Sequence, residues 1–465
     1  MNDALHIARD ALAGEPVWLV GGAVRDELLG RPPAVDVDLI VVGDAAPAAK
    51  RIARAARGTA FELSDDFGAW RVVGPGHSWQ VDITAMRGGS LDADLQLRDF
   101  TINAIACPLA GGDVVDPLGG QSDLDAGRLR MVAPRAFADD PLRVLRLARL
   151  ACELELAADE PTNAAARAHA PQVTAVAQER VFTELKRLIA ADGALRGLAL
   201  MDELGLTDVV LPEVAGLRGV AQNPYHHLDV HGHTLAVLEE TIALERDPAA
   251  ALGSDEHAEA VARVLAEPLA DELDRGTALR FGALLHDAGK PATRAFTADG
   301  RVTFIGHDRV GAQVSRDVLT RLHTSERLKA HVAALATHHL RLGFLVHHRP
   351  LDRRTIYDYL VTCEPVEVDV TLLSVADRLA TRGRNADEAI AKHLDLAREL
   401  LGEALKWRAA PPPEPLIRGD ELAAELGIEP GRRLGELLAE IARARFAGDV
   451  ETREEAVALA RSLPE

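Results

Sequence analysis

The sequence predicts an α/β head, a small mixed sheet with helices, followed by all-α domains. Two observations carry this prediction. Short apolar runs that end at glycine, proline or charged residues are typical of strands, and they occur at 17–20, 36–42 and 80–84. After residue 141 the leucines instead recur at spacings of three and four, which is typical of helices. With 465 residues the chain exceeds one ordinary core, so we expect several domains.

The elements follow one another in a consistent order. Gly21-Gly22 ends the first strand and precedes a helix at 23–29, and a short strand at 114–115 runs into a turn. The Ala- and acid-rich segment 247–275 is either a surface helix or a mobile insertion, and the proline-rich run 409–415 is a linker because prolines break helices. The predicted domains are a head, a helical neck, a larger helical domain and a helical tail, at 1–130, 131–215, 216–408 and 416–465.

Composition limits the classes of function. The net charge of −20 argues against a general nucleic-acid coat, but it does not exclude a local basic cleft, because the window 128–149 is strongly basic. The three scattered cysteines suit a reducing compartment. Neither an apolar run long enough for a membrane span nor a signal-peptide core is apparent, so we expect a cytoplasmic protein without a membrane partner.

The first candidate site combines glycines and carboxylates. Between a strand and a helix, Gly21 and Gly22 let backbone N–H groups approach a triphosphate, and Arg25 adds a positive charge. Asp36 and Asp38 lie two apart on a strand, so their carboxylates share one face. Two such carboxylates suit Mg²⁺, and Asp82 on another strand is a candidate third. The alternative is a Gly-Gly turn beside two solvent-facing aspartates.

A second segment carries arginines at regular spacing. Asp140 before Pro141 is typical of a helix N-cap followed by proline at the first helical position. Asp140, Arg143 and Arg146 then share one side, and Arg149 lies towards its edge. A rigid Asp–Arg pair offers both acceptors and donors to the edge of a cytosine or adenine. A capped surface helix with solvated arginines is the alternative.

The ordered motifs LVGGAVRDELLG, DVDLIVV, RDFTINAIA, DPLGGQSDL, DDPLRVLRLARL and QERVFTELKRL resemble the class II tRNA nucleotidyltransferases (CCA-adding enzymes) and the related bacterial poly(A) polymerases. The resemblance implies that Gly22 and Arg25 contact the triphosphate and that Asp36 and Asp38 hold magnesium. It further implies that Arg98 binds nucleotide and that Asp140 and Arg143 act as an amino-acid template for incoming CTP and ATP, with Arg146 and Arg149 in support. Glu179-Arg180 matches an element that stabilises the neck.

Departures from the family pattern bear on the product. Leu97 replaces an arginine, and Asp139 replaces a glutamate. Only residues 83–97 separate Asp82 from Arg98, where many CCA-adding relatives carry a longer flexible loop. The short segment resembles that of enzymes that add only the two cytidines.

Histidines with metal-ligand spacing follow residue 225. The series resembles the HD phosphohydrolase superfamily, in which an adjacent His-Asp pair and distant His and Asp residues bind divalent ions. The resemblance implies His233, His286, Asp287 and Asp377 as core ligands. It also implies His307 and His339 as the additional ligands of a two-metal site, with His338 as an alternative to His339. Either a phosphohydrolase or a metal site without useful catalysis is consistent with this series.

The function implied is template-independent addition of CCA, or CC only, to the tRNA 3′ end from CTP and ATP. A poly(A) polymerase, a metal-dependent phosphohydrolase with an RNA-binding head, and a pure RNA-binding scaffold remain alternatives.

Overall fold

The computed structural model describes residues 3–32, 36–64, 68–222, 227–253, 255–382, 386–410 and 414–464. Contacts divide the chain into two units, Met1–Val210 and Leu211–Glu465. The finer division into four domains stays a prediction. Pro411–Pro413 of the predicted linker lie outside the described residues. Within the described part of the chain, no helix combines the length and apolar character needed to cross a membrane.

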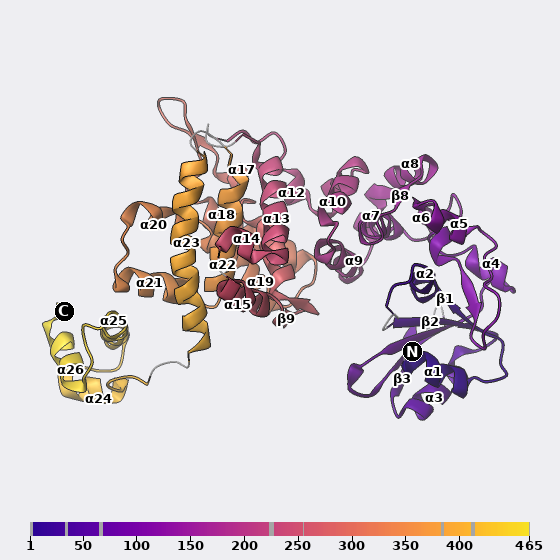
Figure 1. The fold of residues 1–465 in the computed structure, drawn as a ribbon, viewed down its shortest axis with the longest axis horizontal. Coiled ribbons are helices and arrows are strands. Elements are labelled where there is room, and N and C mark those ends of the chain that lie inside the picture. The colour runs from indigo at the N-terminus through magenta and orange to yellow at the C-terminus, as the bar shows by residue number, and fades with distance from the viewer. Residues whose placement is uncertain are drawn as a thin grey trace. The chain divides into compact units, whose positions relative to one another are not determined.

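The first unit is built on a mixed six-stranded sheet with the strand order β3-β4-β5-β2-β1-β6. Its strands are β1 (Val17–Val20), β2 (Asp36–Val41), β3 (Thr59–Ser64), β4 (Ala69–Val73), β5 (Gln80–Ala85) and β6 (Ala106–Pro108). Only β2 and β5 run parallel; the other neighbours are antiparallel. The prediction of a mixed sheet with helices is confirmed (Figure 1).

The two faces of this sheet differ. The helix α3 (Ala45–Ala56) packs on β3, β4 and β5, and α1 (Asp3–Ala11) packs on α3 (Figure 1). On the other face, α4 (Leu91–Leu95) contributes Leu95 to a cluster with Val20, Ile40 and Ala104. Along β2 the exposed Asp36 and Asp38 alternate with the buried Val37 and Leu39, as a half-buried strand requires. The sheet therefore presents its carboxylates on the face opposite α3.

The remainder of the first unit is largely helical. It comprises α2 (Gly22–Leu28), α5 (Gly120–Asp125), α6 (Ala136–Asp139), α7 (Arg143–Glu153), α8 (Glu160–His169), α9 (Gln178–Ala190), α10 (Ala194–Glu203) and α11 (Thr207–Val210). α7 packs against α8, α9 and α10. Its buried Val144, Leu147 and Leu150 show the predicted spacing of three.

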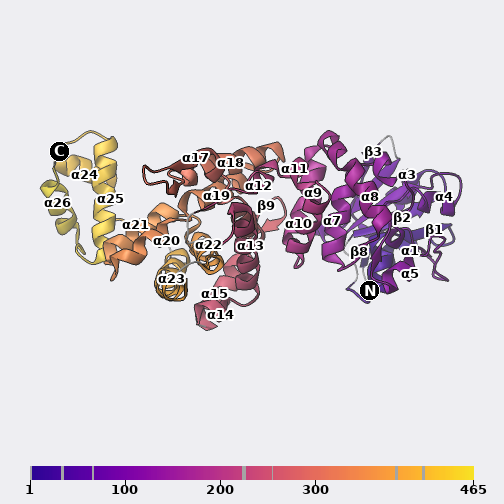
Figure 2. The same cartoon turned by 90° about the horizontal axis from the view of Figure 1, so that it is seen from above.

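The second unit is a set of packed helices with two short hairpins. α13 (Val230–Arg246) packs against α16 (Arg275–Leu285) and α22 (Glu367–Ala380), and α18 (His307–Arg321) packs against α19 (Glu326–His338). α23 (Ala386–Ala409) covers α22. The last helices are α24 (Gly419–Leu426), α25 (Arg432–Ala447) and α26 (Arg453–Ser462), in yellow in Figure 2. They share a core that includes Leu422, Leu437 and Ile441.

Three local predictions need correction or refinement. The helix expected to begin at Pro141 begins at Arg143, because Asp140 is extended and Pro141-Leu142 form a turn, although the Asp140 carboxylate still accepts the Leu142 N–H. The strand expected at 114–115 is only a single bridge between Val115 and Ala106. In the segment 247–275, the helices α14 (Pro248–Leu252) and α15 (Asp255–Leu265) bury Leu252 and Val261, which favours the helical alternative.

Candidate nucleotidyl-transfer and metal sites

The carboxylates of the head lie on neighbouring strands. Asp38 on β2 is the register partner of Asp82 on β5, and Asp36 lies two residues earlier on the same face. Asp82 is not free, because Arg71 on β4 donates from Nε and Nη2 to its two oxygens, each at 2.7 Å. Arg71 escaped the sequence analysis; only the pairing of β4 with β5 reveals it. Asp36 and Asp38 therefore form the carboxylate pair with oxygens available to a cation.

The glycine turn meets these carboxylates directly. Gly21 has a φ of 72°, and a Cβ added there would lie 3.2 Å from Asp38 Oδ2 and 3.4 Å from Arg98 Nη1. Gly21, Asp38 and Arg98 thus converge at the start of α2. A side chain at Gly21 would occupy the space between the N-terminus of α2 and the Asp38 carboxylate.

Arg25 is less accessible than the sequence suggested. Its side chain is buried, with Nη1 donating to Asn103 at 2.7 Å and Nε donating to Asp26 at 2.9 Å. Burial lowers the pKa of Arg25, against the opposing charge of Asp26. Arg25 accordingly ties α2 to the turn Thr101–Asn103 and lies next to Gly22, where a Cβ would be 3.4 Å from its Nη2.

One pocket of about 610 Å³ collects most of the remaining candidates. It is lined by six predicted residues: Asp38, Asp82, Arg98, Asp140, Arg143 and Arg146. Gly21 does not line the pocket, but it lies next to Asp38 and Arg98, which do. The pocket is thus bounded by the carboxylate strands on one side and by α6 and α7 on the other.

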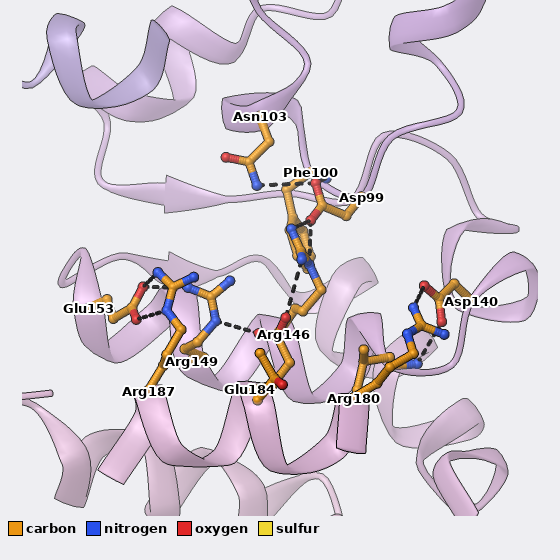
Figure 3. Close-up of polar contacts among 12 residues, drawn as sticks. Asp99, Phe100, Asn103, Asp140, Arg146, Arg149, Glu153, Arg180, Glu184 and Arg187 are labelled. Carbon is orange, nitrogen blue, oxygen red and sulfur yellow. Dashed lines mark hydrogen bonds and ion pairs between the residues drawn. The ribbon is translucent and has the colours of Figure 1, made fainter. Parts of the chain in front are cut away.

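The expected template pair is held rigid, but not by contact between its members. Asp140 accepts from Arg180 Nη2 at 2.8 Å (Figure 3). Arg143 donates to three backbone carbonyls, those of Leu97, Arg98 and Ala136, at 2.8–3.1 Å. Each side chain is therefore fixed by other elements, and Arg143 connects α7 to the segment carrying Arg98.

Arg146, which lines the pocket, is the start of a chain of alternating charges that runs into the protein (Figure 3). Asp99 accepts from Arg146, Glu184 on α9 accepts from both Arg146 and Arg149, and Arg149 also donates to Glu153. Although burial favours its neutral form, Arg146 and two hydrogen bonds hold the pKa of Asp99 well below its usual range. With Arg149 2% exposed, its guanidinium supports Arg146 through Glu184 and is not presented to the pocket.

In the second unit, six predicted side chains meet, with Asp287 at their centre. They come from distant elements: His233 on α13, His286 and Asp287 after α16, His307 at the start of α18, His339 after α19 and Asp377 on α22. His233 Nε2 lies 2.9 Å from Asp377 Oδ1, and His307 Nε2 lies 3.3 Å from His339 Nε2. Two buried triads share Asp287: His233 and His286 on one side, His307 and His339 on the other.

The imidazoles are oriented for metal binding. His286, His307 and His339 each place Nδ1 at 2.7–2.8 Å from a backbone carbonyl, of Ala283, Phe304 and Ala336 respectively. These contacts leave Nε2 directed at Asp287, the arrangement usual for histidine ligands. The Nε2 atom of His286 is buried without a hydrogen-bond partner, so its lone pair is available to a cation.

His339, and not His338, belongs to this cluster. Burial lowers the pKa of the His339 imidazole to about 4, so that it is neutral. His338 accepts a hydrogen bond from Arg341 outside the cluster. Pockets of about 500 and 530 Å³ flank the cluster, and His339 and Asp377 line both. Lys290 lines the larger one, with Nζ 2.7 Å from Asp287.

Comparison with known proteins agrees with this geometry. Residues 17–130 match the poly A polymerase head domain, 156–217 match the probable RNA and SrmB-binding site of polymerase A, and 254–382 match the HD domain. A solved Thermotoga maritima CCA-adding enzyme in complex with tRNA shares the fold, with a TM-score of 0.61, 21% identity, and coverage of 98% of this chain and 93% of that one.

Curated relatives match over nearly the whole chain. The A-adding tRNA nucleotidyltransferase of Deinococcus radiodurans is 37% identical over 96% of this chain and 95% of its own length. The CC-adding enzyme of Thermus thermophilus is 34% identical over 94% and 91%, and the multifunctional CCA protein of Chromobacterium violaceum is 33% identical over 79% and 84%. With the carboxylate pair, the glycine turn and the arginine pocket all in place, the chain belongs to the tRNA nucleotidyltransferase family.

Proposed function

We propose that this enzyme adds C and A nucleotides, as CCA or as CC only, to the 3′ end of tRNA from CTP and ATP, releasing pyrophosphate. The observation that carries the proposal is the convergence of Gly21, Asp38 and Arg98 at one edge of a pocket whose opposite wall holds Asp140 and Arg143. Phosphates bind at the glycine turn, and the base lies between the rigid acceptor and donor side chains.

Asp36 and Asp38 are the residues that would hold Mg²⁺ in this site, since they offer only oxygens from one face of β2. When bound, the metal supplies activation of the attacking hydroxyl and stabilisation of the departing pyrophosphate. Arg98 neutralises phosphate charge beside them. Asp140 and Arg143 replace a template by presenting an acceptor and donors in fixed positions.

The product depends on which nucleotides the pocket accepts. The connection between Asp82 and Arg98 is short and tied down: the Arg87 N–H donates to Asp94, and Ser90 caps α4. This favours addition of the two cytidines only. The similarity to the Deinococcus radiodurans enzyme favours a second candidate, addition of the terminal adenosine.

Three tRNA substrates separate these products. Purified protein is given tRNAs that end before CCA, after C and after CC, each with CTP or ATP. Incorporation of C at the first two alone identifies a CC-adding enzyme, and incorporation of A at the third alone identifies an A-adding enzyme. Incorporation at all three identifies CCA addition, whereas long tails from ATP identify a poly(A) polymerase. An Asp36→Ala variant that is folded but still incorporates nucleotides would contradict the role of the carboxylates.

We further propose that the cluster around Asp287 binds two divalent ions and hydrolyses phosphate esters. Two triads that share one carboxylate, next to two pockets and Lys290, suit this chemistry. His339→Ala and His338→Ala form a matched pair, because the two imidazoles are adjacent in sequence and only one reaches the cluster. The first variant should lose bound metal and chelator-sensitive hydrolysis of bis(p-nitrophenyl) phosphate; the second should lose neither. Equal metal content in the two variants would contradict the assignment. A cytoplasmic location stays a prediction.

A further inference from the structure

A row of side chains starts at the nucleotide pocket and runs across the carboxylate-bearing face of the head sheet to the edge strand β3. Strand register aligns Asp38 on β2 with Asp82 on β5, Asp82 with Arg71 on β4, and Arg71 with Phe61 on β3. Directly paired residues point to the same side of a sheet, so these four side chains share the face that carries the carboxylates. Trp70, next to Arg71, lies under Lys50 of α3 on the opposite face, which agrees with this assignment.

The row ends in a hollow of about 530 Å³ at the edge of the sheet. Its lining includes Arg57, Phe61, Arg71, His77 and Gln80, which we call the edge platform. Phe61 is 44% exposed, and Arg57 and His77 are also exposed. Among the described residues that line this hollow there is no aspartate or glutamate, although the chain as a whole carries a net charge of −20.

An exposed aromatic ring flanked by arginines is the combination that binds single-stranded nucleic acid. The ring stacks on a base of any sequence, and the guanidinium groups neutralise the backbone. Although Arg71 is paired with Asp82, Arg57 meets no acidic side chain among the described residues, so the edge platform keeps a positive charge that the phosphates of RNA would match. The chemistry of the edge platform therefore favours RNA.

The position of the platform indicates which part of the RNA it would bind. Asp38 has the glycine turn on its β1 side. The arginine pocket, proposed to hold the nucleotide, lies on its side towards α7. On the remaining flank, the side chains of Asp82 and Arg71 are partly exposed, at 26% and 30%. In phosphoryl transfer the attacking oxygen lies roughly in line with the leaving group, on the other side of the phosphorus. With the triphosphate at Gly21, the attacking hydroxyl must arrive from the Asp82 flank.

We propose that the edge platform holds the 3′-terminal nucleotides of the RNA acceptor, with Phe61 stacked on a base and Arg57 and Arg71 next to its phosphates. This inference rests on the proposed nucleotidyl transfer. Arg71 has two functions here: it contacts the acceptor backbone and it fixes Asp82. Phe61 is a binding residue and takes no part in the chemical step.

The test uses the full chain with Phe61→Ala, Phe61→Trp and the matched control Phe296→Ala, another exposed phenylalanine, located in the second unit. The first readout is steady-state kinetics with tRNA lacking CCA. One lost base stack predicts a rise in KM for tRNA of about 5- to 10-fold for Phe61→Ala, with KM for CTP changed by less than about twofold. Phe61→Trp should restore the KM for tRNA, and Phe296→Ala should leave both unchanged.

The second readout does not depend on catalysis. A short RNA hairpin carries 2-aminopurine at its 3′-terminal nucleotide, with a 3′-deoxy end that prevents addition. Stacking on Phe61 should quench its fluorescence in the wild type and in Phe61→Trp, but not in Phe61→Ala. Quenching without nucleotide incorporation would refute the proposed function and retain the platform. Incorporation with equal quenching in wild type and Phe61→Ala, or a rise in KM for CTP instead of tRNA, would overturn the platform.

Discussion

Replacement of Glu184 by glutamine tests whether the buried charges behind the pocket act as one network. Glu184 is 6% exposed, and its two oxygens accept from Arg146 at 3.2 Å and from Arg149 at 2.5 Å (Figure 3). Glutamine has nearly the same shape but only one acceptor, so one of the two arginines would face an N–H₂ donor instead of an oxygen.

The expected loss of stability depends on which ion pairs the two arginines keep in the variant. Breaking a buried ion pair by removing one partner costs roughly 3–5 kcal/mol. Arg146 keeps Asp99 and Arg149 keeps Glu153, so part of this cost is offset. We therefore expect Glu184→Gln to lower the free energy of unfolding of the first unit by about 2–3 kcal/mol. For a unit of this size that corresponds to a fall in Tm of about 5–10 °C.

The assay can be made specific for the first unit. Trp18, Trp70 and Trp79 lie in this unit, and Trp407 is the remaining tryptophan. In a Trp407→Phe background, tryptophan fluorescence during urea unfolding therefore reports the first unit alone. Glu203→Gln on α10 is the control, since Glu203 is exposed. A surface change of this kind should alter stability by less than about 0.5 kcal/mol. If the two variants lose equal stability, the network has no energetic role.

Three further predictions follow from the two sites. Gly21→Ala places a Cβ 3.2 Å from Asp38 Oδ2 at a φ of 72°, so KM for the nucleotide should rise several-fold in steady-state assays while the fold persists; an unchanged KM would exclude phosphate binding at this turn. Because the folded-state pKa of Asp99 is depressed, the unfolded chain takes up its proton first as pH falls, and the stability difference between wild type and Asp99→Asn should shrink below about pH 4. Urea unfolding at pH 7 and pH 3.5 measures this, and a difference that is constant with pH would contradict it. In a chain whose other three tryptophans are replaced by phenylalanine, dialysis against EDTA should lower the Tm of the second unit, followed through Trp407, and the decrease should be absent in Asp287→Asn.

The candidate site was predictable where local periodicity decides geometry. Asp36 and Asp38 share a face because side chains alternate along any strand, and Gly21 adopts a positive φ because the chain turns sharply between β1 and α2. The histidine cluster was predictable for a different reason. Its candidate ligands can be recognised from their residue types and their order along the chain, which are the features that carry the family resemblance. Helices far apart in sequence nevertheless supply them.

The contacts that escaped prediction all depend on tertiary pairing between polar residues. Nothing local distinguishes Arg71 from other strand arginines; its place beside Asp82 follows from the register of β4 on β5. Likewise, helical spacing puts Arg149 near the edge of the helix side that carries Arg143 and Arg146. Only the packing of α9 on α7 brings Glu184 within reach of Arg149. A salt bridge to a distant helix then removes the guanidinium from the pocket.

These buried ion pairs and hydrogen bonds have the same effect on the two arginines of the pocket. Arg146 and Arg143 present charge to the pocket, yet both are restrained from behind: Arg146 by Asp99 and Glu184, Arg143 by backbone carbonyls. A long side chain normally loses considerable rotamer freedom when it binds a ligand, and this loss weakens binding. Here much of the freedom is already lost on folding, because α7 is bonded to the segment carrying Arg98 and to α9. An enzyme that selects a base without a nucleic-acid template needs donors and acceptors in fixed positions, and the buried acids provide that rigidity. We therefore propose that the acidic residues next to the arginine pocket strengthen nucleotide selection, although their charge opposes the binding of a triphosphate.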